Sequence, residues 1–533
     1  MVNVQIDGEW KQFPKGTRVI EACGQAGKFI PRYCYHPKLS APGNCRMCLV
    51  EMGMPKMGAD RQPVIGTDGK PEISWIPRPQ ISCAQDVSEG MGIRTDSPLV
   101  QDCRKGVMEF LLINHPLDCP ICDQAGECRL QEFSVEYGTG NSRFLENKVK
   151  KPKNEEIGPR VTLDAERCIL CTRCIRFMKE VANDDVLGIV ERGTFNTIAC
   201  HPDHKLDSNY SLNTVDICPV GALTSTDFRF KMRVWFLKET KSICTSCGTG
   251  CNTTIGSREN VIYRQTPREN NDVNQVWMCD YGRLNFHYLF QEDRLLEPEI
   301  KGAAAVTWRD SISRAASELK KFQGSEIGIV ASGKMTNEEL FLVKNLASTL
   351  GTDLFDIVPR TDKGDDILLS ADRNPNTSGA KLLGVATGKL AEIANGVKSG
   401  AIKALLVLGE DASTLLGDSI ANLQLVVASN ILPNATTKLA TVLLPGAGFS
   451  EKRGSMINLK GRLQRLNRAI NPPGNARDDW EILHDLNSAL SGTNGISSVE
   501  EVFKQMSEAV PVFAGLSLSK IGDLGIPLNL PQP

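Results

Sequence analysis

Cysteine is missing from the second half of this chain, and several other features are missing from all of it. None of the eighteen cysteines lies beyond residue 279 of the 533. No window approaches about eighteen consecutive apolar residues, so no membrane-spanning helix is predicted. The first residues lack the patterns of a secretion signal or a transit peptide. The chain is therefore predicted to be cytosolic. In that reducing compartment, cysteines are more often metal ligands or buried thiols than partners in disulfide bonds.

The sequence also has no large excess of basic or acidic residues, and it lacks the common catalytic motifs. The 61 basic and 63 acidic residues give a net charge of -2, which provides no general reason to expect a nucleic acid or anionic membrane partner. No Gly-x-Gly-x-x-Gly follows a predicted strand and no P-loop motif occurs, so a nucleotide site is not supported. No arrangement of Ser, Cys and His predicts a nucleophile. We predict no catalytic residue on this chain.

The cysteines that are present form a pattern. All but Cys23, Cys103 and Cys200 fall, together with one histidine, into four spaced sets of four. Thiolate-rich sites without surrounding acid-base residues indicate a protein that conducts electrons. The first set is Cys34, Cys45, Cys48, Cys83; the second is His115, Cys119, Cys122, Cys128; the third is Cys168, Cys171, Cys174, Cys218; and the fourth is Cys244, Cys247, Cys251, Cys279.

The third set has the most specific spacing. A C-x2-C-x2-C run with a remote Cys218-Pro219 is typical of a [4Fe-4S] cluster, with structural zinc as the alternative. The fourth set has the same three-then-one arrangement, and it also favours [4Fe-4S] over a zinc ribbon.

The other two sets are more ambiguous. One imidazole with three thiolates suits either tetrahedral zinc or a [4Fe-4S] cluster, and the place of the second set between two predicted clusters favours iron. The first set has an isolated cysteine, a C-x2-C pair and a remote fourth, which is typical of [2Fe-2S]. Gly43 lets backbone N-H groups approach its sulfurs, and residues 52–79 read as a surface insertion.

Residues outside the sets have simpler interpretations. Cys23 and Cys103 are expected to be small buried hydrophobes on helices. The stretch Cys200-His201-x-x-His204 could bind a metal, but it lacks a fourth ligand. Five arginines lie between the ligands in the sequence: Arg46, Arg129, Arg167, Arg173 and Arg176. Together they would offset the negative charge of clusters, although each one could simply be a solvated surface residue.

The N-terminal half is predicted to contain small α+β elements. Apolar and polar residues alternate around Asp7-Gly8, which predicts a β-hairpin with a two-residue turn. Thr17 is expected to cap a short helix. Ser97-Pro98 predicts the start of another helix. The apolar residues of that second helix recur at Val100, Cys103, Val107 and Phe110.

From about residue 296 the pattern changes to apolar strands alternating with helices, which predicts a parallel sheet. The charged stretch 146–156 reads as a linker or solvated loop, and residues 491–533 read as a tail that overlies another surface or is loosely ordered. Strands are expected at residues 327–331, 354–358, 404–408, 425–428 and 441–444, and helices at 337–350 and 390–397.

Longer motifs resemble a known family. The runs Asn114-His115-Pro-Leu-Asp-Cys119 and Cys218-Pro-Val-Gly-Ala-Leu223 closely resemble the large iron-sulfur subunit, the G subunit, of respiratory NADH:quinone oxidoreductase (complex I). Further matching runs are Pro31-Arg-Tyr-Cys34-Tyr-His36-Pro and Cys244-Thr-Ser-Cys247-Gly-Thr-Gly-Cys251. The run from Glu451-Lys-Arg-Gly454 to Asn458 and Gly461-Arg462 looks like part of a truncated molybdopterin-oxidoreductase domain.

The resemblance implies a multidomain α/β and α+β architecture. It begins with a [2Fe-2S] ferredoxin-like β-grasp domain, continues with ferredoxin-like [4Fe-4S] domains and ends with a truncated molybdopterin-oxidoreductase-like α/β domain with a parallel sheet. The expected boundaries are 1–97 for the [2Fe-2S] domain, 98–145 for the [4Fe-4S] domain with one histidine and three cysteine ligands, 158–236 for the ferredoxin-like [4Fe-4S] domain, 237–295 for the molybdopterin-oxidoreductase-type [4Fe-4S] domain, 296–490 for the α/β domain and 491–533 for the tail.

The resemblance also implies a function in electron transfer. It assigns [2Fe-2S] to the first set and [4Fe-4S] to the other three, with no molybdopterin. Electrons would arrive from the FMN-containing, NADH-oxidising flavoprotein, pass the first, third and second sets, and leave for a ferredoxin-like subunit with two [4Fe-4S] clusters, while the fourth set looks like a side branch. The chain would be a peripheral subunit on the cytoplasmic side of a bacterial inner membrane.

Two other classes of protein remain as alternatives. NAD-linked formate dehydrogenases and iron hydrogenases carry similar N-terminal cluster domains. The first class should have a molybdenum-binding Cys or selenocysteine after the fourth set, and the second a further cysteine-rich domain; no cysteine follows Cys279. A zinc-stapled scaffold without redox function is the third possibility.

Overall fold

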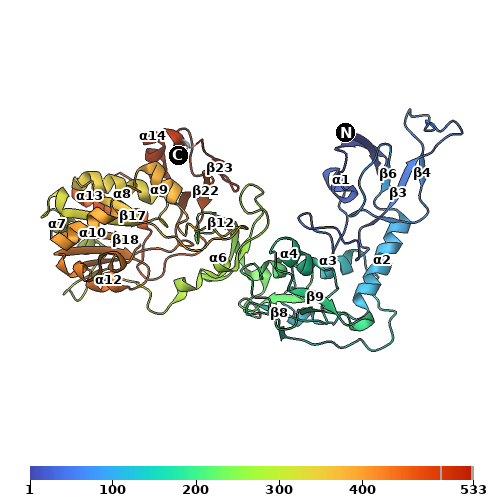
Figure 1. The fold of residues 1–533 in the computed structure, drawn as a ribbon, viewed down its shortest axis with the longest axis horizontal. Helices are drawn as coiled ribbons and strands as arrows, with labels where there is room; N and C mark the ends of the chain where they lie inside the picture. Colours follow the sequence, from blue (N-terminus) through green and yellow to red (C-terminus); the bar gives the residue numbers. More distant parts are fainter. Residues whose placement is uncertain (493–494, 530–533) are drawn as a thin grey trace. The chain divides into compact units, whose positions relative to one another are not determined.

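The structure is a computed structural model that describes residues 1–492 and 495–529. The chain forms two compact units, the first from Met1 to Phe236 and the second from Leu237 onward. Figure 1 draws the first unit from blue to green and the second from light green to red. Across the described ranges, no helix is both long enough and apolar enough to cross a lipid bilayer.

The first unit begins with a mixed sheet and one packed helix, as the N-terminal pattern predicts. Strands β1 (Val2–Ile6) and β2 (Glu9–Phe13) form the predicted hairpin. Its turn residues Asp7 and Gly8 both have positive φ, as a two-residue turn of this kind requires. The strand order is β2-β1-β6-β3-β4, with β1 parallel to β6. The remaining elements are α1 (Val19–Gln25), β3 (Leu49–Pro55), β4 (Ile73–Trp75), β5 (Gln80–Ile81) and β6 (Gly92–Arg94).

The rest of the first unit consists of short helices and two small sheets. Helix α2 (Pro98–Leu112) starts where predicted, with the Ser97 side chain accepting a hydrogen bond from the Val100 N-H. Strands β7, β8 and β11 form one small antiparallel sheet, and β9 and β10 form another. The bounds are α3 (Arg129–Glu136), β7 (Glu155–Glu156), β8 (Val161–Leu163), α4 (Arg173–Glu180), β9 (Leu187–Val190), β10 (Thr197–Cys200), α5 (Asn213–Asp216) and β11 (Leu223–Ser225).

Three local predictions for this unit need correction. Thr17 does not cap α1: its hydroxyl donates to the Pro14 carbonyl, and Arg18 occupies the cap position without a side-chain hydrogen bond. Cys23 is buried, but Cys103 is only half-buried. Phe110 is 78% exposed, because the buried face of α2 carries Val100, Arg104 and Met108 instead.

The charged stretch before β7 is a loop held in place by its lysines. Lys148 Nζ donates to the Leu112 and Ile113 carbonyls at 2.8 Å. Lys153 Nζ pairs with three carboxylates, those of Asp118, Asp164 and Glu166, at 2.6 to 3.3 Å. These contacts fasten the loop beside the second ligand set, a role that a solvated linker would not have.

The second unit opens with a three-stranded antiparallel sheet, β12 (Lys238–Ile243), β13 (Asn252–Arg258) and β14 (Val261–Pro267), followed by helix α6 (Asp280–Leu284). A larger sheet then has the order β15-β20-β19-β18-β16-β17, parallel except for β15. The predicted parallel sheet is therefore confirmed. Its strands are β15 (Glu299–Ile300), β16 (Ile327–Ser332), β17 (Phe355–Val358), β18 (Ala404–Leu408), β19 (Leu425–Asn430) and β20 (Val442–Pro445).

Helices cover both faces of this sheet (Figure 1). On one face α7, α8 and α13 pack against strand residues such as Ile329 and Leu406, and on the other α10 packs against Val330 and Leu405. Alternating strand residues thus face opposite cores, as expected of a doubly covered parallel sheet. The helices are α7 (Trp308–Leu319), α8 (Asn337–Leu350), α9 (Thr377–Leu383), α10 (Leu390–Ser399), α11 (Ser413–Leu416), α12 (Ala435–Leu439) and α13 (Asp479–Ser491).

The C-terminal segment is more ordered than the sequence composition suggests. Within residues 495–529, α14 (Val499–Ala509) packs Phe503 and Met506 into the core, and β23 (Ile526–Pro527) pairs with β22 (Arg462–Leu466). Strand β22 also pairs with β21 (Gly454–Ile457). The alternative of a loosely ordered tail was therefore wrong for these residues, whereas that of a tail lying over another surface agrees with this packing and pairing. Residues 493–494 and 530–533 lie outside the described ranges.

A buried charged group joins α8 to the segment that leads into β21. Lys452 Nζ donates to Glu339 at 2.8 Å and to Asp479 at 3.1 Å, and all three side chains are largely buried. Next to it, both carboxylate oxygens of Glu338 accept hydrogen bonds at 2.8 Å, from the N-H and the hydroxyl of Ser455. Complete burial raises the pKa of Glu338 to about 7.

We expect this carboxyl to make the second unit less stable as pH rises. In the folded chain Glu338 keeps its proton up to a pH of about 7, whereas the unfolded carboxyl loses it near 4.5. The free energy of unfolding should therefore fall between these two pH values, by roughly 3 kcal/mol at most. Urea unfolding from pH 4 to 8 should show that the fall is smaller in Glu338→Gln, and an equal fall in both proteins would contradict the assignment.

Candidate iron-sulfur sites

The first ligand set comes from the loop before β3, which carries Cys34, Cys45 and Cys48, and from the turn after β5, which carries Cys83. The thiols of Cys45 and Cys83 lie within hydrogen-bonding reach of the Cys34 sulfur and lower its pKa, and Cys83 also lies within reach of Cys48. Backbone N-H groups of Asn44 and Cys45 also point at Cys34. Gly43, whose φ of 65° favours glycine, forms the turn that allows this approach.

The second set follows α2 and ends at the start of α3. Its four members line one small cavity, which also contains Arg167 and Gly221. Burial, with Arg167 and Lys148 nearby, lowers the pKa of His115 to about 4, so the imidazole is neutral near pH 7 and able to bind metal. The Leu130 and Gln131 N-H groups at the start of α3 are aimed at Cys128, where they favour the thiolate.

The third set lines another cavity, with walls of Leu163, Ile198 and Val220. Burial raises the pKa of Cys168 to about 11 and of Cys171 to about 12. Three N-H groups, those of Val220, Ala222 and Leu223, point at the sulfur of Cys218. These thiols therefore need a compensating positive charge, such as iron, to become thiolates in so apolar a cavity.

The fourth set lies in the second unit and is clamped by contacts with two distant segments. Cys244 follows β12 and Cys251 precedes β13, with a 2.8 Å hydrogen bond from the Cys244 N-H to the Cys251 carbonyl. Leu368 packs against the cluster that these two cysteines form with Met278, and the Thr249 hydroxyl donates to the Leu368 carbonyl. In the second segment, the Leu459 N-H donates to the Gly248 carbonyl at 2.8 Å.

The members of all four predicted sets lie close to one another. Across residues 1–492 and 495–529, however, no three or more His, Cys, Asp or Glu side chains are grouped so that they could hold a single metal ion. The second and third sets each line a cavity, and a cluster needs such space between its ligands, whereas a single zinc ion is bonded directly by all of them. Cys200 is engaged elsewhere, with its thiol directed at the Ile157 carbonyl.

The sets of the first unit are joined by direct contacts. Arg176 of α4 donates to the carbonyls of Cys34 and Cys171, which connects the first and third sets. Gly221, three residues after Cys218, lies against the second set: a Cβ atom added there would be 2.2 Å from the Cys122 sulfur. The Arg129 N-H donates to the Pro219 carbonyl at 3.2 Å. The third set therefore contacts both the first and the second.

The five arginines that were predicted to offset the negative charge of clusters lie in different surroundings. Arg167 is buried and paired with Asp118 and Asp164 beside the second set. Arg46 is exposed, and Arg129 pairs with Glu132 on the surface. Arg173 and Arg176 lie against ligand loops. The contact between Gly221 and Cys122 was not predicted. The glycine in the run Cys218-Pro-Val-Gly could have indicated it, because glycine often marks a place where another group approaches the backbone closely.

Comparison with known proteins gives family assignments along the chain. Five family models match: "2Fe-2S iron-sulfur cluster binding domain" at 1–98, "NADH-ubiquinone oxidoreductase-G iron-sulfur binding region" at 104–143, "NADH-quinone oxidoreductase subunit 3, ferredoxin-like domain" at 158–224, "Molybdopterin oxidoreductase Fe4S4 domain" at 237–289 and "Molybdopterin oxidoreductase" at 368–489. These matches support iron-sulfur domains of both the 2Fe-2S and the 4Fe-4S type.

Whole-chain similarity decides the family. The NADH-quinone oxidoreductase G subunit of Rickettsia conorii is 31% identical, with 97% of this chain and 92% of the relative covered. The chain belongs to the G-subunit family of NADH-quinone oxidoreductase. The G subunit of Rickettsia prowazekii is 33% identical over 92% of this chain and 72% of its own length.

Relatives in this family also occur beyond bacteria. The mitochondrial "NADH dehydrogenase [ubiquinone] iron-sulfur protein 1" of Solanum tuberosum is 41% identical, over 66% of this chain and 45% of the relative. Among solved structures, an NAD+-reducing [NiFe]-hydrogenase matches at 27% identity with a TM-score of 0.36, covering 44% of this chain and 91% of that one.

Proposed function

We propose that this chain is an electron-transfer subunit in the peripheral arm of NADH-quinone oxidoreductase, on the cytoplasmic side of a bacterial membrane. The sixteen predicted ligands hold one [2Fe-2S] and three [4Fe-4S] clusters, which accept and release single electrons. The observation that carries the proposal is the contact of the third set with the first through Arg176 and with the second through Gly221.

These contacts support the order first set, third set, second set. The protein supplies no catalytic side chain along this route; its residues hold the ligands in apolar surroundings and aim backbone N-H groups at the sulfurs. The NADH-oxidising flavoprotein would deliver electrons to the first set, and a ferredoxin-like subunit would take them from the second. The fourth set, in the other unit, would be a side branch.

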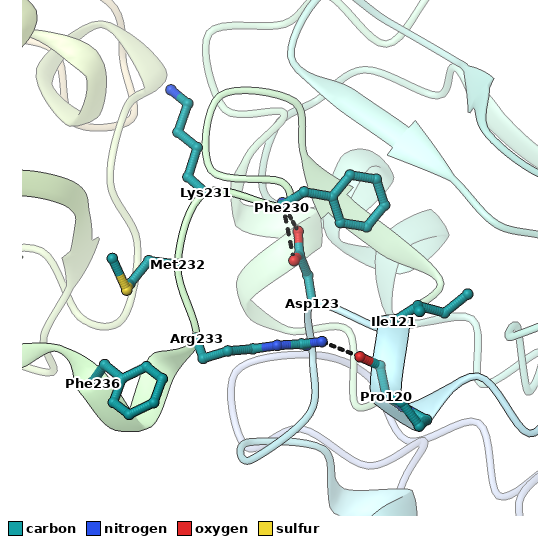
Figure 2. A pocket seen from close by; sticks show the side chains of 8 residues that line it. All are labelled: Pro120, Ile121, Asp123, Phe230, Lys231, Met232, Arg233 and Phe236. Atoms are coloured by element: carbon teal, nitrogen blue, oxygen red, sulfur yellow. Dashed lines mark hydrogen bonds between the residues drawn. The ribbon is translucent and has the colours of Figure 1, made fainter.

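The surface beside the second set suits the outgoing partner. Cys119 is exposed, whereas the other cysteine ligands are buried or half-buried. Leu117 is 89% exposed and Ile121 62%. Pro120 and Ile121 also line an open cavity of about 540 Å³ (Figure 2). An apolar rim around an exposed ligand would exclude water from a docked electron acceptor.

Basic residues on this cavity indicate an acidic partner. Arg233 reaches across it, donating to the Pro120 and Cys122 carbonyls (Figure 2). Lys231 extends away from Asp123 and pairs with Asp227 at 3.0 Å. The Asp123 carboxylate accepts a hydrogen bond from the Phe230 N-H at about 3 Å. The cationic side chains would attract a protein that carries thiolate-ligated clusters.

We expect Ile121→Glu to weaken binding of the ferredoxin-like subunit about tenfold, because the change adds a negative charge at the centre of this rim. Titration of the reassembled peripheral arm, followed by light scattering or co-sedimentation, would measure the effect. Ile65→Glu, which alters a side chain that is 56% exposed on the loop after β3, is the matched control. Equal affinity of both variants would exclude this surface as the docking site.

We propose that the second unit binds no molybdopterin. No cysteine follows Cys279, and the loop of the fourth set is in contact with both Leu368 and Leu459. These contacts restrict the space that a molybdenum cofactor exchanging electrons with this set would need.

Metal analysis and the co-purifying proteins test the proposed function. Anaerobically purified chain should contain about 14 iron atoms and no stoichiometric zinc, and a flavoprotein and a quinone-site subunit should co-purify with it. Zinc in place of iron would favour the scaffold alternative. Molybdenum with formate-dependent NAD reduction would favour a formate dehydrogenase.

A further inference from the structure

Two arginines on the first turns of α4 extend from the third ligand set to the first. Arg173 donates to the Tyr35 carbonyl at 2.5 Å and to the Ile217 carbonyl at 3.0 Å. Tyr35 follows Cys34 and Ile217 precedes Cys218, so this guanidinium group joins the residues next to one ligand of each set.

Arg176 makes the more direct connection. Its Nη2 atom donates to the Cys34 carbonyl at 2.6 Å and lies 3.4 Å from the Cys171 carbonyl. Its Nη1 atom donates to the Ser40 carbonyl, and its Nε atom reaches the Thr172 hydroxyl at 3.3 Å. One nitrogen atom is therefore shared by the backbones of two ligands from different sets.

Other contacts fasten the same two loops. The Asn44 side chain donates to the Leu170 carbonyl at 3.1 Å. Ser40 donates twice to Glu180 at the end of α4, at 2.9 Å from its N-H and 2.5 Å from its hydroxyl. The loop is thus held at several points, so loss of Arg176 alone should leave it folded.

We propose that Arg176, supported by Arg173, is a positioning residue that sets the electronic coupling between the first and third sites by bridging the Cys34 and Cys171 carbonyls. This inference rests on the proposed function. In the transfer concerned, one electron leaves the first site, which is oxidised, and arrives at the third, which is reduced. No covalent bond forms or breaks, and the guanidinium group keeps its proton.

The charges around the bridge are favourable. The Cys171 and Cys218 sulfurs lie near Arg173, so the guanidinium group would stabilise negative charge on the third site once its ligands are thiolates. Lysine would retain the charge of Arg176, but it lacks the planar group that reaches both carbonyls while bonding to Ser40.

The test uses Arg176→Lys and Arg176→Gln in the assembled complex, with Lys179→Gln as the control. Lys179 lies on the same helix, is exposed and pairs with Asp185, so its replacement removes one charge without touching a ligand loop. Reduction of each site after rapid mixing with NADH is followed by freeze-quench electron paramagnetic resonance, and equilibrium redox titration gives the potentials.

We expect Arg176→Lys to retain the potentials of both sites but to slow arrival of electrons at the third site several-fold. Arg176→Gln should slow arrival and also lower the potential of the third site, and the control should do neither. If electrons reached the third site at the wild-type rate in both Arg176 variants, the inference would be wrong. It would also be wrong if only Arg176→Gln were slower and its lower potential accounted for the whole decrease in rate. Failure of NADH to reduce the third site in the wild-type complex would instead refute the proposed function.

Discussion

Gly221→Ala should abolish the cluster that we propose for His115, Cys119, Cys122 and Cys128. An alanine Cβ at position 221 would lie 2.2 Å from the Cys122 sulfur, a distance at which two non-bonded atoms cannot remain, and in tight contact with the Gln124 Cβ at 3.1 Å. Gly221 is fixed by Cys218 on one side and β11 on the other, so the Cys122 ligand has to move. We expect a loss of about four iron atoms per chain and of the corresponding paramagnetic signal.

Gly188→Ala is the control for this prediction. Gly188 lies on β9 in the same unit, and a Cβ atom there would meet nothing within 4 Å. That variant should retain its iron and its spectrum. If Gly221→Ala kept the full iron content and an unchanged second-site signal, the close approach of the third and second ligand sets would be wrong.

Lys452→Met should strongly destabilise the second unit. Lys452 is 7% exposed in its side chain and is paired with Glu339, which is 1% exposed, and with Asp479. Its removal leaves two carboxylates without a positively charged partner, beside Asp478, whose pKa burial already raises. Breaking a buried ion pair in this way costs about 3 to 5 kcal/mol. The urea midpoint of the second unit, followed by tryptophan fluorescence, should fall accordingly.

Two further variants test this explanation. Lys241→Met removes an exposed lysine that pairs with Asp523, and such surface pairs contribute about 1 kcal/mol or less. Adding Glu339→Gln to Lys452→Met removes one of the stranded charges, so the double variant should recover part of the lost stability. A Lys452→Met midpoint no lower than that of Lys241→Met would refute the importance of the buried group.

Much of the fold could be predicted because local signals agreed with the tertiary structure. Helix α8 runs over the predicted residues 337–350, where Thr336 and Glu339 form a capping box. The five predicted strands of the parallel sheet are all present, because buried parallel strands are continuous apolar runs. Helix α14 was missed, since the composition of the surrounding tail outweighed Ser498 and the helical spacing of Val499, Val502 and Phe503.

For the site, spacing predicted which residues come together but not how the sets touch one another. The members of each set lie close in the sequence, or join one remote cysteine to a run. The contacts between sets, such as Arg176 with Cys34, join residues 142 positions apart. Sequence spacing contains no information on such a distance, so Arg176 could be recognised only as one more basic residue near a ligand.

The clamp over the fourth ligand set has a consequence for how the chain matures. Its cysteines are complete once residue 279 has been synthesised, but Leu368 and Leu459, which close over the Cys247–Cys251 loop, emerge from the ribosome much later. Synthesis at about 5 to 20 residues per second leaves several seconds between these events. Iron and sulfide delivered before these residues emerge would meet an uncovered site, whereas in the completed chain Leu368 and Leu459 would have to move aside first.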